Sequence, residues 1–390
     1  MKKLNRKTLH VAISFAAFLM IGANDGALGV ILPSISTHYH VDHATVGLLF
    51  FASTIGYFIA SFASGPLAVG LGTRNFLLLA SLIFLLATGI LSLAPPFVLL
   101  LVAALLLGSG IALIDAGLNA YIAGLPHNTA LLNYLHAFYG AGAWLGPVVA
   151  SGLLALQFTW NNVYLVWGGM SLLLLFSIAP VFESRTPAQA REAKQEGNLL
   201  AITLRHRAVW LAAFFLLVYV GSEVSLGNWS YSFLTEERRG AALISGWMVS
   251  GYWFGLTLGR LVLGRVGQAI GNRQLIQICL GGVVAGLLLV WLFPQQPVEA
   301  LGLWLTGFCL GPLFPTTIAL MSTLVSSRIL PGAVGFMTSL GSMGGALFPW
   351  LAGNLAQHIG LWSLLPYIIA LSAVMLAIWG LLQRQPRVNC

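Results

Sequence analysis

Three acidic side chains, Asp25, Asp115 and Glu223, lie inside long apolar stretches of this chain. An ionisable side chain at the centre of a bilayer costs about 2.5–3.5 kcal/mol on insertion scales, so it is rare and usually faces a cavity, a partner or a proton path. Apolar surroundings disfavour the charged form of a carboxyl group, which can then take up and release protons. We expect these acids to couple transport to protons or to bind substrate, although a buried acid can also be hydrogen-bonded for structural reasons.

Amide and aromatic residues lie close in sequence to these acids. Asp115 and Asn119 are four residues apart, so on a helix they share one face, and a protonatable group then lies beside an amide that can bind a hydroxyl group. Small-molecule sites combine such placed polar groups with flat apolar surfaces, although aromatic residues are also common in helix packing. The expected substrate-binding residues are Asn24, Asn119, Phe138, Tyr139, Tyr219, Glu223, Asn228, Trp229 and Trp253.

The composition predicts an all-α membrane protein that positions these residues on membrane-spanning helices. Hydrophobic residues make up 58% of the 390 residues, charged residues only 7%, and the mean hydropathy is +0.90. At about 20 residues per crossing, this length allows about twelve spans with short loops. We place them at 9–33, 44–69, 76–94, 97–124, 132–157, 162–182, 208–235, 243–265, 274–293, 298–323, 332–357 and 361–383.

Two pseudo-symmetric six-helix halves are predicted, residues 1–182 and 208–390, joined by a polar cytoplasmic linker at 183–207. The halves share motifs, which favours duplication and a site at the bilayer midplane that opens alternately to either side. The matched motifs are Gly22 with Gly221, Gly56-Tyr57 with Gly251-Tyr252, Gly65-Pro66-Leu67 with Gly259-Arg260-Leu261, and Gly146-Pro147 with Phe348-Pro349.

The basic residues indicate topology. Of the 18 Lys and Arg residues, 16, Arg260 among them, fall on one side of the predicted spans, and only Arg238 and Arg239 fall on the other. The positive-inside rule then puts both termini in the cytoplasm, and we expect the inner (plasma) membrane of a bacterium. The net charge of +8 is scattered over short loops, so nucleic acid is not an expected partner. A lipid bilayer, protons and a small-molecule substrate are expected, with the chain acting as a monomer.

Other chemistries find little support in the chain. The cysteines Cys279, Cys309 and Cys390 have no CxxC spacing, and the histidines His38, His40 and His43 of the first outer loop do not follow a known ligand pattern. No HExxH, nucleophile-elbow or nucleotide-binding glycine motif occurs. We expect no enzyme activity, no catalytic residue, no metal and no cofactor, and an ion gradient or facilitated diffusion in place of ATP.

The segment from Gly65 to Arg74 resembles the G-x-L-A-D-R-x-G-R-R motif of the major facilitator superfamily. Val69 stands at the acidic position of that motif and Gly70 at the next, basic one. The resemblance implies twelve helices in two halves. It also implies a gating or packing role for the positions at which this chain keeps the motif, and for the Gly-Pro pair of the fifth span. These residues are Gly65, Gly72, Arg74, Gly146 and Pro147.

Within that family the chain is similar to the fucose:proton symporter branch, which places an acid one helical turn before an Asn, as Asp115 and Asn119 do here. The resemblance implies uptake of a monosaccharide with protons by alternating access. An alternative is a proton-coupled drug or metabolite exporter, because the run from Gly142 to Pro147 resembles the G-x-x-x-G-P core of such antiporters. Ala150 and Ser151 occupy the positions where that motif closes with Gly-Gly.

Overall fold

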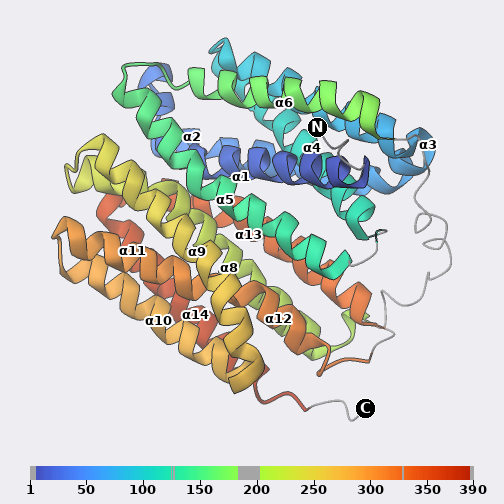
Figure 1. Ribbon diagram of the computed structural model, residues 1–390. Coiled ribbons are helices and arrows are strands. Elements are labelled where there is room, and N and C mark those ends of the chain that lie inside the picture. Colours follow the sequence, from blue (N-terminus) through green and yellow to red (C-terminus); the bar gives the residue numbers. More distant parts are fainter. Residues whose placement is uncertain (1–5, 124, 126–127, 183–202, 327–328, 387–390) are drawn as a thin grey trace. The chain divides into compact units, whose positions relative to one another are not determined.

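The computed structural model describes residues 6–123, 125, 128–182, 203–326 and 329–386 (Figure 1). The regular structure of these residues is helical throughout. Most of the predicted linker, residues 183–202, lies outside the described residues. Helices suit so apolar a chain, because a helix satisfies all its backbone hydrogen bonds within one segment of lipid-embedded chain.

Contacts between residues divide the chain into two units. The first unit lies within Met1–His40 and Phe51–Gln195, and the second within Val41–Phe50 and Glu196–Cys390. The first contains α1 (Arg6–Tyr39), α3 (Leu48–Ser92) from Phe51 onward, α4 (Phe97–Ala123), α5 (Asn128–Ala155) and α6 (Asn162–Val181). The second contains α2 (His43–Val46), α8 (Arg207–Ser232), η2 (Phe233–Glu237), α9 (Ala242–Ile270), α10 (Asn272–Leu292), α11 (Gln296–Leu310), α12 (Leu313–Met321), α13 (Leu330–Ile359), η3 (Leu361–Ser363) and α14 (Leu364–Leu382).

Each of the twelve predicted spans coincides with helix in the described residues. Nine helical segments there are long and apolar enough to cross a membrane, and one of them, His43–Ser92, contains both the second and the third predicted span. The helix direction changes between these two at Gly72, whose φ is 70°. The tenth predicted span, 298–323, differs from expectation because Gly311 and Pro312 divide it into α11 and α12.

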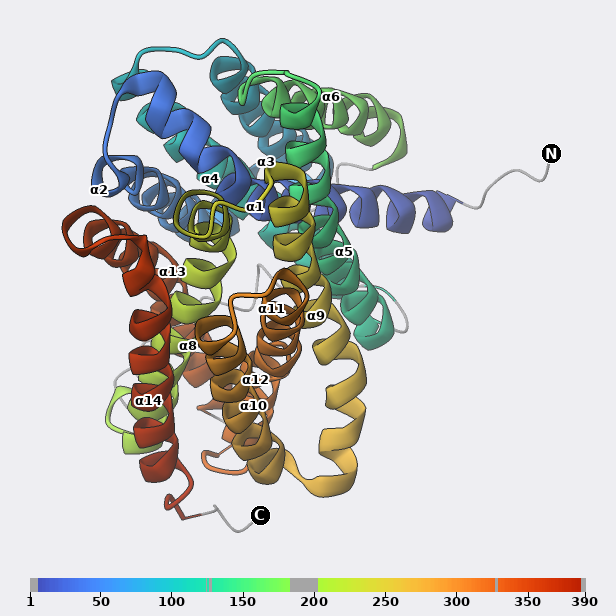
Figure 2. The ribbon, with the colours of Figure 1, turned by 90° about the vertical axis from the view of Figure 1, so that its left-hand side faces the viewer.

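Close helix pairs inside each unit depend on glycine. In the first unit, a Cβ atom on Gly22 would lie 2.0 Å from the carbonyl oxygen of Tyr139, and one on Gly142 would lie 2.0 Å from that of Leu19. Small residues thus let the backbones of α1 and α5 touch, which is how helices associate in membranes. In the second unit, α10 and α11 approach at Gly286 in the same way (Figure 2).

The two units repeat one another, but the structure pairs some of their glycines differently from the sequence prediction. The difference is one helical turn. Gly56 meets the Leu105 carbonyl where α3 crosses α4, and Gly255 meets the Trp304 carbonyl where α9 crosses α11. Both members of the second pair stand 199 residues after those of the first. The glycines that carry a positive φ where each chain turns, Gly72 and Gly271, have the same spacing. Gly56 therefore corresponds to Gly255. The predicted match of Gly56 with Gly251 is wrong, and so is that of Gly65 with Gly259.

The contact of α1 with α5 is repeated by that of α8 with α13, at a different residue spacing. Gly142 meets the Leu19 carbonyl across α5 and α1, and Gly344 meets the Leu217 carbonyl across α13 and α8. Residues of α8 thus stand 198 after their counterparts in α1, and residues of α13 stand 202 after those in α5. The kink prolines Pro147 and Pro349 keep the second spacing. By this register Gly221 corresponds to Ala23, so the predicted match of Gly22 with Gly221 is one residue off.

The predicted first outer loop is largely helical. Helix α1 continues past Pro33 to Tyr39, and α2 begins at His43. Although α2 follows α1 in sequence, it packs within the second unit. The ring of His43 lies edge-on to Trp229 with 5.5 Å between ring centroids, and its Nε2 is 3.6 Å from the Glu236 carboxylate.

Candidate functional site

Asp25 lies on α1 of the first unit and is held by two neutral donors. The Tyr139 hydroxyl donates to its Oδ2 at 2.8 Å, and the Asn24 amide donates to its Oδ1 at 3.1 Å. Tyr139 comes from α5, so the close contact of α1 with α5 delivers the hydroxyl to the acid. Asp25 remains partly accessible, as a residue that exchanges protons must be.

Asp115 on α4 has a matching environment. The Tyr57 hydroxyl of α3 donates to its Oδ2 at 3.1 Å, and the Asn119 amide donates to its Oδ1 at 2.9 Å. The shared helix face of Asp115 and Asn119 was predicted, whereas Tyr57 was missed as a partner. Asp115 also interacts electrostatically with Asp25.

Glu223 on α8 of the second unit has a charged partner instead. Its Oε1 lies 3.2 Å from Nη2 of Arg260, and the side chains are only 11% and 31% exposed respectively. The Tyr219 hydroxyl interacts with both groups, and the Tyr252 hydroxyl donates to the Glu223 carbonyl at 2.9 Å. The prediction counted Arg260 among the charges of one membrane side, and in the structure it lies inside α9, where its charge balances a buried acid. An arginine within an apolar span was the signal for this role.

The same guanidinium contacts the break in the tenth span. Arg260 Nε donates to the Gly311 carbonyl at 3.3 Å, just after the end of α11. The last carbonyl groups of a helix have no partner within that helix, and a cation placed there satisfies one of them. Broken helices of this kind form substrate and ion sites in secondary transporters.

Several buried side-chain polar atoms of the second unit have no hydrogen-bond partner among the described residues. Two of them, from the helices α8 and α9, are Oδ1 of Asn228 and Nε1 of Trp253, in residues that are 4% and 5% exposed. The Trp253 ring packs against Gly227, next to Asn228 in the chain. An unpaired buried acceptor and donor are costly, so these atoms indicate a place where water or a polar ligand binds.

Other predicted site residues contribute to packing. Trp229 is 1% exposed and its Nε1 donates to the Pro349 carbonyl at 2.8 Å, which leaves no ring face for a ligand. Phe138 is 39% exposed and stacks on Phe15 with 4.8 Å between centroids. These contacts of Trp229 and Phe138 do not include any of the three acids. The Tyr139 hydroxyl, by contrast, donates directly to Asp25.

The predicted motif residues have distinct surroundings. Gly72 forms the turn in α3, and Arg74 just after it is exposed. A Cβ atom on Gly146 would lie 2.2 Å from the Ala23 carbonyl, so this position serves the contact of α5 with α1. A Cβ on Gly65 would meet nothing within 4 Å, and Pro147 lies inside α5.

The register of the repeat gives the acids a relationship that the sequence alone did not suggest. Asp25 on α1 corresponds to residue 223 on α8, which is Glu223, because residues of these helices stand 198 apart. Each unit thus carries an acid at the same place. The two differ in their partners, a tyrosine hydroxyl in the first unit and an arginine in the second.

Apolar spanning helices, two repeated units and buried acids define a multi-pass membrane transporter. Residues 14–245 and 211–389 match the family model of the Major Facilitator Superfamily. The chain therefore belongs to this superfamily, as the sequence predicted, and it is a transporter, not an enzyme.

Individual relatives agree with this assignment. "Bypass of stop codon protein 6" of Saccharomyces cerevisiae is 27% identical, over 96% of this chain and 81% of that protein. The glucose/mannose transporter GlcP of Bacillus subtilis is 23% identical, over 87% of this chain and 86% of its own length. A solved bacterial homologue of the human lysosomal transporter Spinster has the same fold, with a TM-score of 0.82 at 13% identity over 99% of this chain and 98% of that one.

Proposed function

We propose that this transporter carries a monosaccharide together with protons by alternating access, in the inner membrane of a bacterium, as a monomer with both termini in the cytoplasm. Residues 1–182 and 208–390 would form the two moving halves, joined by the linker at 183–207. The observation that carries the proton part is the environment of Asp25 and Asp115. Their hydrogen-bond partners are neutral hydroxyl and amide donors, and no cation pairs with either acid among the described residues.

Glu223 is a poorer proton carrier in this proposal, although it occupies the same position as Asp25. The Arg260 charge 3.2 Å away favours the ionised carboxylate, so protonation of Glu223 would leave the guanidinium unbalanced. Asp25 and Asp115 have no such constraint. When one of them takes up a proton, the electrostatic cost of occluding the site falls, and substrate binding then favours closure of the protonated state.

The substrate part rests on placed polar groups beside aromatic rings. Asn228 Oδ1 and Trp253 Nε1 offer one acceptor and one donor that need partners, and sugar hydroxyl groups supply both roles. Tyr219 and Trp253 lie on the same two helices, α8 and α9, and both rings are buried in this structure. A relative that is a glucose/mannose transporter supports a hexose as the first candidate.

The glycines that suggested an exporter do not favour export over uptake. Gly142 and Gly146 both lie against carbonyl groups of α1, so their small size is explained by helix packing in either direction of transport. Uptake is therefore tested first.

The decisive experiment uses the purified protein in liposomes that contain a pH-sensitive dye. Glucose, galactose or fucose is added outside, and internal acidification is recorded. We expect acidification with at least one sugar, and its loss in Asp25→Asn and Asp115→Asn. Both variants should still exchange labelled sugar across the membrane, because exchange needs substrate binding but no net proton movement.

Asp42→Asn is the control, since this acid lies between two spans and should not affect acidification. If no sugar moves protons while the wild type expels a cationic dye from inverted vesicles, the symport proposal is wrong and the chain is an exporter. If Glu223→Gln alone abolishes acidification, the proton carrier lies in the second unit and the assignment to Asp25 and Asp115 is wrong.

A further inference from the structure

Helix α2 belongs to the second unit, although the chain on either side of it, α1 and most of α3, belongs to the first. It packs against α13, beside which it lies in Figure 2. The backbone amide of His43 donates to the Gln357 side chain at 3.3 Å, and a Cβ atom on Gly353 would lie 2.7 Å from the His43 carbonyl oxygen. Val46 has no exposed surface. Helix α2 is therefore docked on the second unit by specific contacts.

The equivalent segment of the repeat is not docked in this way. By the spacings of 198 and 199 residues found for α8 and α9, α2 corresponds to residues 241–245 at the start of α9. The first four of these residues are exposed, with Leu243 at 43% and Ile244 at 47%. The duplication therefore does not account for the docking of α2.

A titratable side chain, His43, takes part in this docking. Its ring lies edge-on to Trp229 of α8, and its Nε2 is 3.6 Å from the Glu236 carboxylate of η2. The two side chains are 20% and 40% exposed, so protons from solvent reach both. A neutral imidazole at this distance is attracted only weakly to a carboxylate, whereas an imidazolium forms an ion pair with it. Histidine is the side chain whose charge ordinarily changes between pH 5 and pH 8.

The other titratable groups around His43 add to this attraction. Asp42, the N-cap of α2, interacts electrostatically with His43 and with His358 of α13. The Thr45 hydroxyl and amide hold the pKa of Asp42 below its usual 3.8, so this acid stays charged from pH 5 to pH 8. A proton on His43 therefore places a positive charge near two carboxylates, Asp42 and Glu236, and near one other histidine.

We propose that His43 is a pH-sensitive latch, whose protonation strengthens the docking of α2 on the second unit. Because α2 continues into α1 and α3, stronger docking restrains the ends of the helices that carry Asp25 and Tyr57. The consequence for transport rests on the proposed function, in which α2 lies on the outer side and the two halves move. An acidic exterior then slows opening to the outside. The ion pair is partly exposed, so we expect a change of only about two- to fivefold.

The docking is measured with the full-length protein in liposomes, without sugar and without a pH gradient. A spin label is attached at Ala44→Cys in a chain whose three native cysteines are replaced by serine, and its mobile fraction is recorded from pH 8 to pH 5. We expect this fraction to fall about two- to fivefold towards pH 5. His43→Gln and Glu236→Gln should each remove the change. Hydrogen exchange of residues 41–50 in unlabelled protein, compared between wild type and His43→Gln at each pH, detects rarer undocking.

Two other histidines provide matched controls. The His38 ring lies 5.8 Å from that of Trp160 in the first unit, so His38→Gln should keep the pH response. His358→Gln should also keep it, although His358 interacts with Asp42. Exchange of labelled sugar should slow from pH 7.5 to pH 5.5 by about two- to fivefold more in wild type than in His43→Gln.

Three outcomes would overturn the latch. They are a mobile fraction that does not change with pH in wild type, one that rises towards pH 5, and a response that survives in His43→Gln but is lost in either control. If the label and the hydrogen exchange respond as expected but no sugar is exchanged, the latch is supported and the sugar proposal fails.

Discussion

Asp25 and Glu223 occupy equivalent positions on α1 and α8, yet within the described part of the chain only Glu223 has a cationic partner, with Arg260 Nη2 at 3.2 Å. The difference separates two roles that the amino-acid types do not distinguish. An acid held by hydroxyl and amide donors can change its charge during a transport cycle. An acid paired with a guanidinium resists that change, and here it also links α8 and α9 to the broken helix through the Gly311 carbonyl.

The ion pair of the second unit should matter for stability. We expect Arg260→Met to destabilise the protein by about 1–3 kcal/mol, because it leaves the Glu223 carboxylate buried without its partner. The effect is measured as a shift in thermal unfolding in detergent. Glu223→Gln combined with Arg260→Met should recover part of the loss, whereas Arg74→Met, at an exposed position, should change little. A double variant as unstable as the sum of the single ones would argue against coupling between the two side chains.

The tyrosine hydroxyl groups of the first unit should matter for transport. Tyr57→Phe and Tyr139→Phe each remove one donor to an acid, and a hydrogen bond to a charged group contributes about 1.5–3 kcal/mol. We expect each variant to slow sugar-driven acidification of liposomes by about tenfold with little loss of folded protein. Tyr134→Phe serves for comparison, because Tyr134 is 60% exposed. Equal rates in all three variants would show that these hydroxyl groups do not support coupling.

The register of the internal repeat can be tested by adding a single methyl group. A Cβ on Gly255 would lie 2.3 Å from the Trp304 carbonyl, whereas one on Gly251 would meet nothing within 4 Å. Gly255→Ala should therefore cost about 1–3 kcal/mol through overpacking, and Gly251→Ala should be neutral or stabilising by up to about 1 kcal/mol. Thermal unfolding distinguishes the two. The reverse order would restore the pairing of Gly56 with Gly251.

The docking of α2 should depend on pH through its N-cap. The Thr45 hydroxyl and the Thr45 amide, the latter at 2.7 Å, both donate to the Asp42 carboxylate, and they hold the pKa of Asp42 below its usual 3.8. A lowered pKa in the folded state means that the cap contributes fully above pH 3.8 and is lost as the pH falls through the folded value. A spin label at Ala44→Cys should gain mobility in that acidic range. Asp42→Asn still caps the helix without titrating, so its label should show no such transition.

The sequence by itself determined the membrane-spanning helices, the family and the three buried acids. These depend on local composition, because any apolar segment of sufficient length must form a helix to satisfy its backbone in lipid, and because a charge within such a segment is conspicuous wherever it falls. The pairing of Asp115 with Asn119 was also predictable, since both lie on one helix four residues apart.

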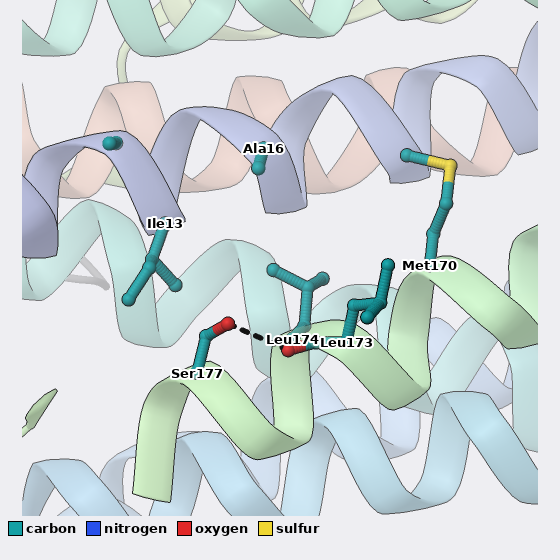
Figure 3. A pocket seen from close by; sticks show the side chains of 7 residues that line it. Ile13, Ala16, Met170, Leu173, Leu174 and Ser177 are labelled. Carbon is teal, nitrogen blue, oxygen red and sulfur yellow. Dashed lines mark hydrogen bonds between the residues drawn. The ribbon is translucent and has the colours of Figure 1, made fainter. Parts of the chain in front are cut away.

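Only the tertiary structure decided which distant residues meet. Tyr139 contacts Asp25, Arg260 contacts Glu223, and Trp229 packs beneath α2, across sequence separations that periodicity does not encode. The repeat was mispaired by one turn because glycines recur every three or four residues on these helices, so several alignments look alike until backbone contacts select one. The apolar groove lined by Ala12 and Ala16 of α1 and by Met170 of α6 (Figure 3) is likewise invisible in the sequence, because it forms only where small residues of one helix face another helix.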